Sequence, residues 1–162
     1  MRTHRVIESP VGPLTAVSTD GVLSGLYMTE AAHLPASFGD ASSQGAGRLE
    51  AELAEYFAGE RTAFTVPTAA VGTPFQLRVW EQLTAIGYGS TRSYLDLALS
   101  LGDARLVRAV GAANGRNPLS IVVPCHRVVG SDGTLTGYAG GVARKQLLLA
   151  LEDPRRAPDT LF

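Results

Sequence analysis

The stretch from Ser93 to Arg116, SYLDLALSLGDARLVRAVGAANGR, predicts a helix, a tight turn and a second helix. A capping-box pattern opens at Ser93, so the first helix is expected over residues 94–101. Gly102-Asp103 is a turn signal, and the second helix is expected over about residues 104–114. Two short helices joined in this way are typical of a helix-turn-helix unit.

The second helix of this unit has one apolar face and one basic face. At about 100° per residue, Leu106, Val107 and Val110 fall on the same side. The other side, which we expect to be exposed, carries Arg105, Arg108, Ala109, Ala112 and Arg116. Small residues let a helix approach a nucleic-acid groove closely, and arginines reach phosphates or bases. The pattern indicates a DNA-recognition helix, and a plain surface helix of an αα-hairpin is the alternative.

The residues just before this unit predict another helix. Thr73 is placed to cap it, Pro74 occupies the first helical position, and Gln76 completes a capping box. The helix is expected to end at Gly87. Its apolar stripe consists of Phe75, Val79, Leu83 and Ile86, with Trp80 beside it.

The N-terminal region has a residue pattern that is typical of short strands. Runs near Arg5–Glu8, Leu14–Val17 and Val22–Tyr27 alternate apolar and polar residues. Turn signals at Gly12-Pro13 and Asp20-Gly21 separate them. We therefore expect an antiparallel meander.

Less regular elements follow the meander. Residues 29–47 are expected to form a loop, and a helix is expected from Ala46 to Ala58. Thr62–Val66 has the composition of one more strand, and Pro67–Gly72 that of a linker.

Charge and element type both change near residue 70. Residues 1–70 hold 4 basic and 8 acidic side chains, whereas residues 71–162 hold 10 basic and 7 acidic ones. A polyanionic partner should therefore meet the second part. We expect an α/β fold of the α+β kind, with a small antiparallel-sheet N-terminal domain (1–70) and a mainly helical C-terminal domain (71–162) that holds the helix-turn-helix.

The overall composition excludes several classes of protein. The chain has 162 residues, of which 45% are hydrophobic and 18% charged, as in ordinary globular proteins. It has no run of about 18 to 20 apolar residues and no apolar leader, so we expect a cytoplasmic protein with no membrane partner. A single cysteine excludes disulfide scaffolds and structural zinc sites built on cysteines.

That cysteine follows an apolar run, Leu119–Val123, which predicts a strand. A lone buried cysteine is commonly an inert packing residue. Here Pro124 must bend the chain, and His126 and Arg127 are neighbours that can stabilise a thiolate. Adjacent strand residues point to opposite faces, so Cys125 and His126 can cooperate directly only if the backbone turns. We expect a bridging water instead.

A third group should orient the imidazole, and a carboxylate is the usual choice. The helix expected over residues 142–152 ends in Glu152, where the macrodipole disfavours negative charge, so this carboxylate is a candidate. A solvated surface glutamate is the alternative. Just before the helix, Gly137–Gly141 sets one tyrosine among small residues and is a candidate pocket wall, although a mobile linker has the same composition.

Together these segments resemble the O6-alkylguanine-DNA alkyltransferase family, in order and in spacing. The residues that carry the resemblance are Val123–Val128 (VPCHRV), Arg108–Gly111, Asn117-Pro118, Gly137–Gly141 and Glu152. It is specific over about residues 73–152. The N-terminal region resembles the family only in outline and in residues 9–14.

The resemblance implies a reaction that each molecule performs once. Cys125 would attack the alkyl carbon on guanine O6 and keep the alkyl group as a thioether. His126 would activate the thiol through a water, and Glu152 would orient the imidazole. Asn117 matches the family's hinge residue, which ties the DNA-binding element to the active site.

The resemblance also implies that the damaged nucleotide is flipped out of the duplex. Arg108 would fill the gap, while the helix enters the minor groove by its small residues, Ala109, Ala112 and Gly115. Tyr94 matches the tyrosine that crowds the DNA phosphate and hydrogen-bonds the flipped base. The pocket for this base would consist of Tyr94, the carbonyl side of Val128, and the backbone of Tyr138 and Ala139.

The implied partner is double-stranded DNA containing O6-alkylguanine, with O4-methylthymine as a weaker substrate. Members of the family that bind zinc do so through N-terminal cysteines, which this chain lacks, so we expect no metal and no cofactor. We expect a monomer, and cooperative binding along DNA stays open.

Two other functions are consistent with the same residues. A Cys-His hydrolase would use the same thiolate, would turn over many times and would need an oxyanion site. A non-catalytic DNA-binding regulator would keep Cys125 as a core residue and would retain its function in Cys125→Ala.

Overall fold

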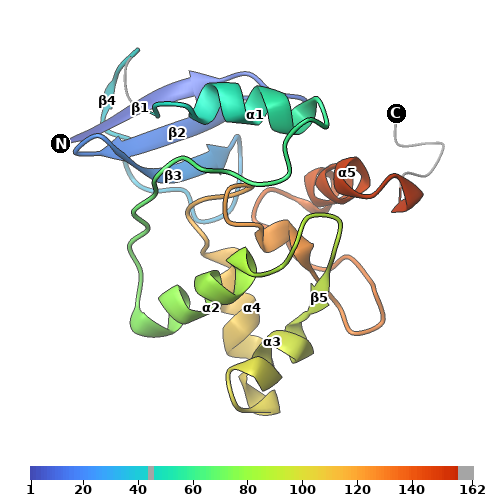
Figure 1. The fold of residues 1–162 in the computed structure, drawn as a ribbon. Helices are drawn as coiled ribbons and strands as arrows, with labels where there is room; N and C mark the ends of the chain where they lie inside the picture. The colour runs from blue at the N-terminus through green and yellow to red at the C-terminus, as the bar shows by residue number, and fades with distance from the viewer. Residues whose placement is uncertain (44–45, 157–162) are drawn as a thin grey trace.

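A computed structural model describes residues 1–43 and 46–156. Its N-terminal part is a sheet with the strand order β3-β2-β1-β4 (Figure 1). The strands are β1 (Arg2–Ile7), β2 (Leu14–Thr19), β3 (Val22–Met28) and the short β4 (Asp40–Ala41). The first three form the predicted antiparallel meander. The loop expected over residues 29–47 adds β4 parallel to β1, and its residues 44–45 lie outside the described ones.

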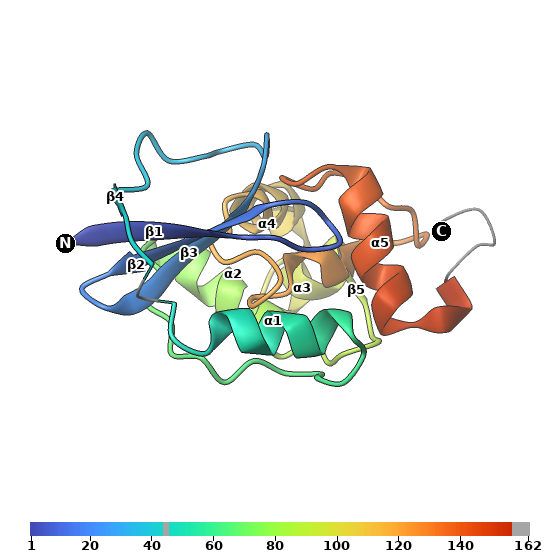
Figure 2. The same cartoon turned by 90° about the horizontal axis from the view of Figure 1, so that it is seen from above.

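Helix α1 (Leu49–Phe57) lies against this sheet, as both views show (Figures 1 and 2). It begins three residues later than predicted. Ala46 has φ +58° and Gly47 has φ +48°, so both have left-handed backbones that an α-helix cannot include.

The strand predicted at Thr62–Val66 is wrong. The backbone N–H groups of Thr65 and Val66 donate to the Glu52 carboxylate, at 2.8 and 3.2 Å, and not to a neighbouring strand. The buried Glu52 side chain of α1 therefore accepts these two backbone N–H groups, which would donate to a neighbouring strand if the segment were part of a sheet.

The second part of the chain is mainly helical, as predicted. Its helices are α2 (Pro74–Thr84), α3 (Tyr94–Ser100), the 3₁₀ turn η1 (Ala104–Leu106), α4 (Val107–Gly115) and α5 (Val142–Glu152), followed by the 3₁₀ turn η3 (Pro154–Arg156). Both predicted capping boxes are present, at Thr73 and at Ser93. Helices α3 and α4 form the helix-turn-helix, and the Trp80 indole on α2 donates to the Ala113 carbonyl of α4 at 2.9 Å.

The strand predicted at Leu119–Val123 is also wrong. Within this run only Leu119 forms a bridge, to Leu26 of β3, and the chain then turns. Val123 donates back to Leu119 at 2.8 Å, and Ile121 has φ +73°. The run is buried except for the half-buried Val122, and its hydrogen bonds are mostly local.

This turning segment joins the sheet to the helices. Two short elements follow it: the 3₁₀ turn η2 (Cys125–Arg127), and β6 (Val128–Val129), which pairs in parallel with β5 (Arg92–Ser93). One cluster of buried hydrophobic residues extends from Leu14 and Leu26 in the sheet to Leu83 and Leu148 in the helices. The fold is therefore α+β, and the division into domains at residue 70 stays a prediction, with residues 157–162 of the second domain outside the described ones.

Candidate active site

The predicted nucleophile, Cys125, lies at the start of η2 and is 3% exposed. Burial raises the pKa of its thiol, because an apolar surrounding disfavours the thiolate. The polar groups of Asn117 and Tyr138 and the positive charge of Lys145 act in the opposite direction. The thiol is therefore buried beside groups that favour its charged form.

The backbone turns where a strand was expected to end. Cys125–Arg127 form a 3₁₀ turn after Pro124, whose carbonyl accepts a hydrogen bond from the Arg127 N–H at 3.0 Å. Cys125 and His126 are thus not constrained to the opposite faces of a strand. A backbone turn is what direct cooperation between the Cys125 and His126 side chains requires, and this turn provides it.

His126 contacts Glu152, as predicted. Its Nε2 lies 2.8 Å from Oε2 of the carboxylate, and the imidazole is fully buried. Burial lowers the pKa of His126, and Glu152 opposes this shift. Because Nε2 faces the carboxylate, Nδ1 is the nitrogen left to accept a proton, and it has no hydrogen-bond partner within residues 1–43 and 46–156.

Glu152 is 5% exposed and ionised. Burial acts to raise the pKa of this carboxyl, but hydrogen bonds from His126 and Arg127 outweigh burial and lower the pKa to about 2. The helix dipole disfavours a negative charge at this helix end, and the hydrogen bonds from His126 and Arg127 offset that cost.

Arg127 does not have the predicted role. Its Nε and Nη2 donate to Glu152 at 2.8 and 3.0 Å, and its Nη1 donates to the Ile86 carbonyl at 2.6 Å. With these donors engaged, the guanidinium neutralises Glu152 and does not support the Cys125 thiolate. The charged group that acts on the thiol is Lys145.

Asn117 lies between α4 and the segment that carries the cysteine. Its Nδ2 donates to the Val123 carbonyl at 2.8 Å, and its Oδ1 accepts from the Leu119 N–H at 3.1 Å. The side chain thus holds together the turn that leads into Cys125, in the position predicted for a hinge.

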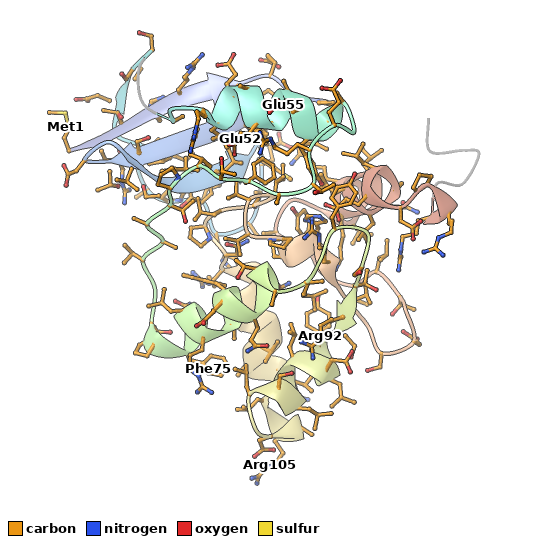
Figure 3. All side chains as sticks on the ribbon, in the orientation of Figure 1. Met1, Glu52, Glu55, Phe75, Arg92 and Arg105 are labelled. Atoms are coloured by element: carbon orange, nitrogen blue, oxygen red, sulfur yellow. The ribbon has the colours of Figure 1, made fainter. Side chains whose placement is uncertain are left out.

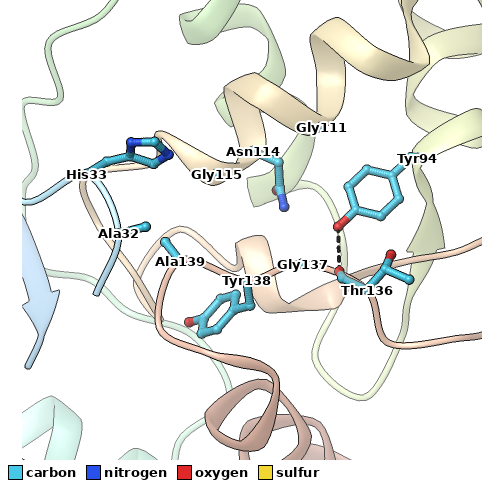
Figure 4. A pocket seen from close by; sticks show the side chains of 10 residues that line it. All are labelled: Ala32, His33, Tyr94, Gly111, Asn114, Gly115, Thr136, Gly137, Tyr138 and Ala139. Atoms are coloured by element: carbon cyan, nitrogen blue, oxygen red, sulfur yellow. Dashed lines mark hydrogen bonds between the residues drawn. The ribbon is translucent and has the colours of Figure 1, made fainter. Parts of the chain in front are cut away.

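A cavity of about 390 Å³ lies between α4 and residues 136–139 (Figure 4). Of the predicted pocket residues, Tyr94, Tyr138 and Ala139 line it, and so does Gly115, predicted as a groove contact. Tyr94 donates to the Thr136 carbonyl at 3.1 Å. Val128 is fully buried and does not line the cavity. The other lining residues are Ala32, His33, Gly111, Asn114, Thr136 and Gly137.

The basic face of α4 is exposed, as predicted. Figure 3 shows Arg105 at the end of the molecule far from Met1. Arg105 pairs with Asp103 at 2.8 Å, whereas Arg108 and Arg116 form no ion pair with any described residue. Ala109 and Ala112 are exposed between these arginines.

Two residues of the site were missed from the sequence. Lys145 is fully buried on α5, donates to the carbonyls of Thr136 and Gly137 at 3.2 and 3.3 Å, and lies 5.8 Å from the centre of the Tyr94 ring. Burial lowers its pKa to about 8. It is the only lysine in the sequence and shares a helical stripe with Glu152, which could have indicated it.

The other missed residue, Tyr56, lies on α1 and donates to Glu152 Oε2 at 2.6 Å. No local pattern links it to a partner so distant in the sequence.

Among the described residues, there is no group of three or more His, Cys, Asp or Glu side chains placed to hold a metal ion. In the same part of the chain, no helix is both long and apolar enough to cross a membrane.

Comparison with known proteins gives a consistent result. Residues 74–154 match the family described as "6-O-methylguanine DNA methyltransferase, DNA binding domain". The methylated-DNA–protein-cysteine methyltransferase of Mycobacterium tuberculosis is 48% identical over 162 residues, which cover 98% of each chain. That of Methanosarcina barkeri is 43% identical over 156 residues, 93% of this chain and 96% of the relative.

Solved structures agree. The crystal structure of Mycobacterium tuberculosis OGT in complex with DNA superposes with a TM-score of 0.87 at 47% identity, over 96% of this chain and 95% of that one. The O6-methylguanine-DNA methyltransferase of Pyrococcus kodakaraensis matches with a TM-score of 0.57 at 25% identity, over 94% and 99%. Fold and sequence thus agree over nearly the whole length, and the chain belongs to the methylated-DNA–protein-cysteine methyltransferase family.

Proposed function

We propose that this protein repairs DNA by transferring the alkyl group of O6-alkylguanine to its own Cys125, once and irreversibly. The observation that carries the proposal is the environment of the thiol. The only cysteine of the chain is buried next to a histidine whose Nε2 faces a carboxylate and whose Nδ1 has no hydrogen-bond partner among the described residues. Family membership supports the same reaction, and so does a relative solved in complex with DNA.

The chemistry is a single displacement. A water accepts the Cys125 proton and passes one to Nδ1 of His126, and Glu152 stabilises the resulting imidazolium. The thiolate sulfur then forms a bond to the alkyl carbon as the bond from that carbon to O6 breaks. The electron pair stays on the guanine, which regains the proton that left the thiol. The thioether has no route back to a thiol, so each molecule acts once.

The cavity beside Cys125 is proposed to hold the flipped base. Asn114, one of its lining residues, donates to the Cys125 carbonyl at 3.4 Å, so the cavity borders the segment that carries the nucleophile. Tyr94 would hydrogen-bond the base and help neutralise charge on the departing guanine. Tyr138, Ala139 and the carbonyl side of Val128 would read the base edge.

Helix α4 is the proposed contact with double-stranded DNA. Its exposed alanines allow close approach in the minor groove, with Gly115 at the edge of the cavity. Arg108 would fill the gap left by the flipped nucleotide. We propose action as a monomer in the cytoplasm without a cofactor, on O4-methylthymine less well than on O6-alkylguanine.

The test is the mass of the intact protein after mixing with a duplex that contains one O6-methylguanine. Undamaged duplex and the Cys125→Ala protein are the controls. We expect a gain of one methyl group per chain only with damaged DNA and intact Cys125. No gain in folded protein that binds the duplex would overturn the proposal and favour a DNA-binding regulator. Repeated turnover of an ester substrate at Cys125, without methyl transfer, would favour the hydrolase.

A further inference from the structure

A tyrosine from the sheet layer reaches the buried carboxylate at the end of α5. Tyr56 lies near the end of α1, which ends beside α5 in both views (Figures 1 and 2). Its hydroxyl donates to Glu152 Oε2 at 2.6 Å, across 96 residues of sequence, and both side chains are buried. The carboxylate that faces His126 is therefore completed by a residue outside the segment that matches the family's DNA-binding domain.

The donors around Glu152 are unevenly shared between its two oxygens. Oε1 accepts from Nε of Arg127. Oε2 accepts from Nη2 of Arg127 at 3.0 Å and from Tyr56, and it also faces Nε2 of His126 at 2.8 Å. An oxygen that already accepts two hydrogen bonds holds less negative charge for a third partner. The Tyr56 hydroxyl thus acts on the same atom that orients His126.

Tyr56 is also a fixed donor. Burial and the negative charge of Glu152 raise its pKa far above the usual value for tyrosine, so the hydroxyl keeps its proton. The ring is held by Phe57, Phe64 and Tyr88, with centroids 5.2, 5.4 and 6.3 Å away. The hydroxyl therefore points at Oε2 without having to be ordered during the reaction.

We propose that Tyr56 is a positioning residue for alkyl transfer, whose hydroxyl withdraws negative charge from Oε2 of Glu152 and so limits how strongly His126 holds a proton. The N-terminal part would then tune the proton relay formed by Glu152 and His126, in addition to supporting the fold. This inference rests on the proposed function, in which His126 takes up the proton that leaves Cys125.

The sign of the effect follows from the charges near the relay. Without the hydroxyl, Oε2 holds more negative charge, which stabilises the imidazolium and raises the pKa of His126. The pKa of Glu152 rises too, because the carboxylate has lost a donor. The other titratable groups around the relay stay in place: Arg127, Lys145, Tyr88, Tyr138 and Cys125. The higher pKa of His126 moves the acidic limb of the transfer rate to higher pH, because the imidazole must be neutral to accept a proton.

The experiment measures single-turnover methyl transfer, by intact mass, between about pH 5 and about pH 9 for wild type and Tyr56→Phe. We expect the acidic limb to move up by about one pH unit, with about tenfold slower transfer below it and little change above it. Tyr27→Phe, which removes a tyrosine hydroxyl from β3, is the matched control and should leave the limb in place. A purely structural role would slow transfer by the same factor at every pH.

Two further measurements keep the inference open to refutation. In a Glu152→Gln background the hydroxyl has no carboxylate to act on, so adding Tyr56→Phe should leave the residual transfer profile unchanged. 3-Fluorotyrosine at position 56 is a stronger donor that keeps the ring, and it should move the limb to lower pH. An unshifted limb in both substituted proteins would overturn the inference.

Failure of the proposed function would be recognised separately. If wild type transfers no methyl group, titration of His126 by NMR still compares wild type with the position-56 variants. We expect a higher His126 pKa in Tyr56→Phe and a lower one with 3-fluorotyrosine. Equal values in all three proteins would contradict the inference, whatever the protein's activity.

Discussion

At the scale of single residues, the buried network around Glu152 couples stability to pH. Four donor atoms on three side chains surround one carboxylate, and Arg127 supplies the charge that balances it. A buried ion pair of this kind is costly to break, because one partner is then left as an unpaired charge. Glu152 therefore contributes to stability in addition to its proposed role in the reaction.

Glu152→Gln removes the charge of this buried carboxylate while keeping the side chain's size. The pKa of Glu152 is lowered from 4.5 to about 2, so the carboxylate stabilises the folded state by about 3 kcal/mol above pH 5. This contribution is lost as the pH falls from about 5 towards 2, because the folded state must then take up the proton. We expect the variant to unfold about 3 kcal/mol more easily at pH 7 and to approach wild type near pH 2.

Urea unfolding at a series of pH values measures this difference. Glu60→Gln is the matched control, because Glu60 is exposed and its side chain bonds to no residue within 1–43 and 46–156; it should differ little from wild type at any pH. A Glu152→Gln deficit that stays constant down to pH 2 would show that the side chain's shape and not its charge is responsible.

At the scale of elements, helix starts could be predicted because their signals are local. The Thr73 and Ser93 capping boxes need only residues three apart, and both are present. The two strands predicted at Thr62–Val66 and Leu119–Val123 failed for a common reason. Their composition suits a strand, but their backbone groups find partners outside any strand ladder: the Glu52 carboxylate in one segment and mostly local carbonyls in the other. Composition alone does not show these partners.

The same distinction applies to the candidate site. Cys125, His126 and Glu152 were predicted from a motif and a helix end, and the structure brings the histidine and glutamate together. Arg127 was assigned to the wrong partner, because residue type does not show which way a side chain points. Tyr56 could not be found, since its contact joins two elements that only the folded core brings together.

A prediction at this scale concerns the cap of α3. The Ser93 hydroxyl accepts from the Asp96 N–H at 2.9 Å, and the helix it starts presents Tyr94 to the cavity. Ser93→Ala should cost about 1 kcal/mol of stability and loosen Tyr94. We expect slower methyl transfer from duplex DNA as well as a lower melting temperature.

Thr73→Ala is the matched control, because it removes the same kind of cap from α2. It should lower the melting temperature by a similar amount and leave transfer nearly unchanged when both proteins are folded. Equal losses of transfer in the two variants would show that general stability, and not the placement of Tyr94, controls the rate.

Across the whole molecule, charge is distributed unequally between the N-terminal and the helical part. The acidic N-terminal part forms the sheet layer, and α4, whose exposed side is basic, lies in the helical part below that sheet in Figure 1. A net charge of −1 gives little general attraction to DNA, so binding should depend on a few well-placed arginines. Arg105 pairs with Asp103, whereas the exposed Arg108 of α4 and Arg116 at its C-terminal cap form no ion pair with any described residue.

The last prediction separates the position of Arg108 from its charge. If this side chain fills the gap left by a flipped nucleotide, Arg108→Ala should slow transfer from duplex DNA on the order of tenfold, because the unstacking cost is no longer offset. Transfer from the free base O6-methylguanine, which needs no flipping, should be unchanged. Arg78→Ala removes the same charge from the exposed side of α2 and is the control. An equal loss in both variants would show that overall charge matters, whereas a loss confined to Arg108→Ala and to duplex substrate assigns the flipping step to this residue.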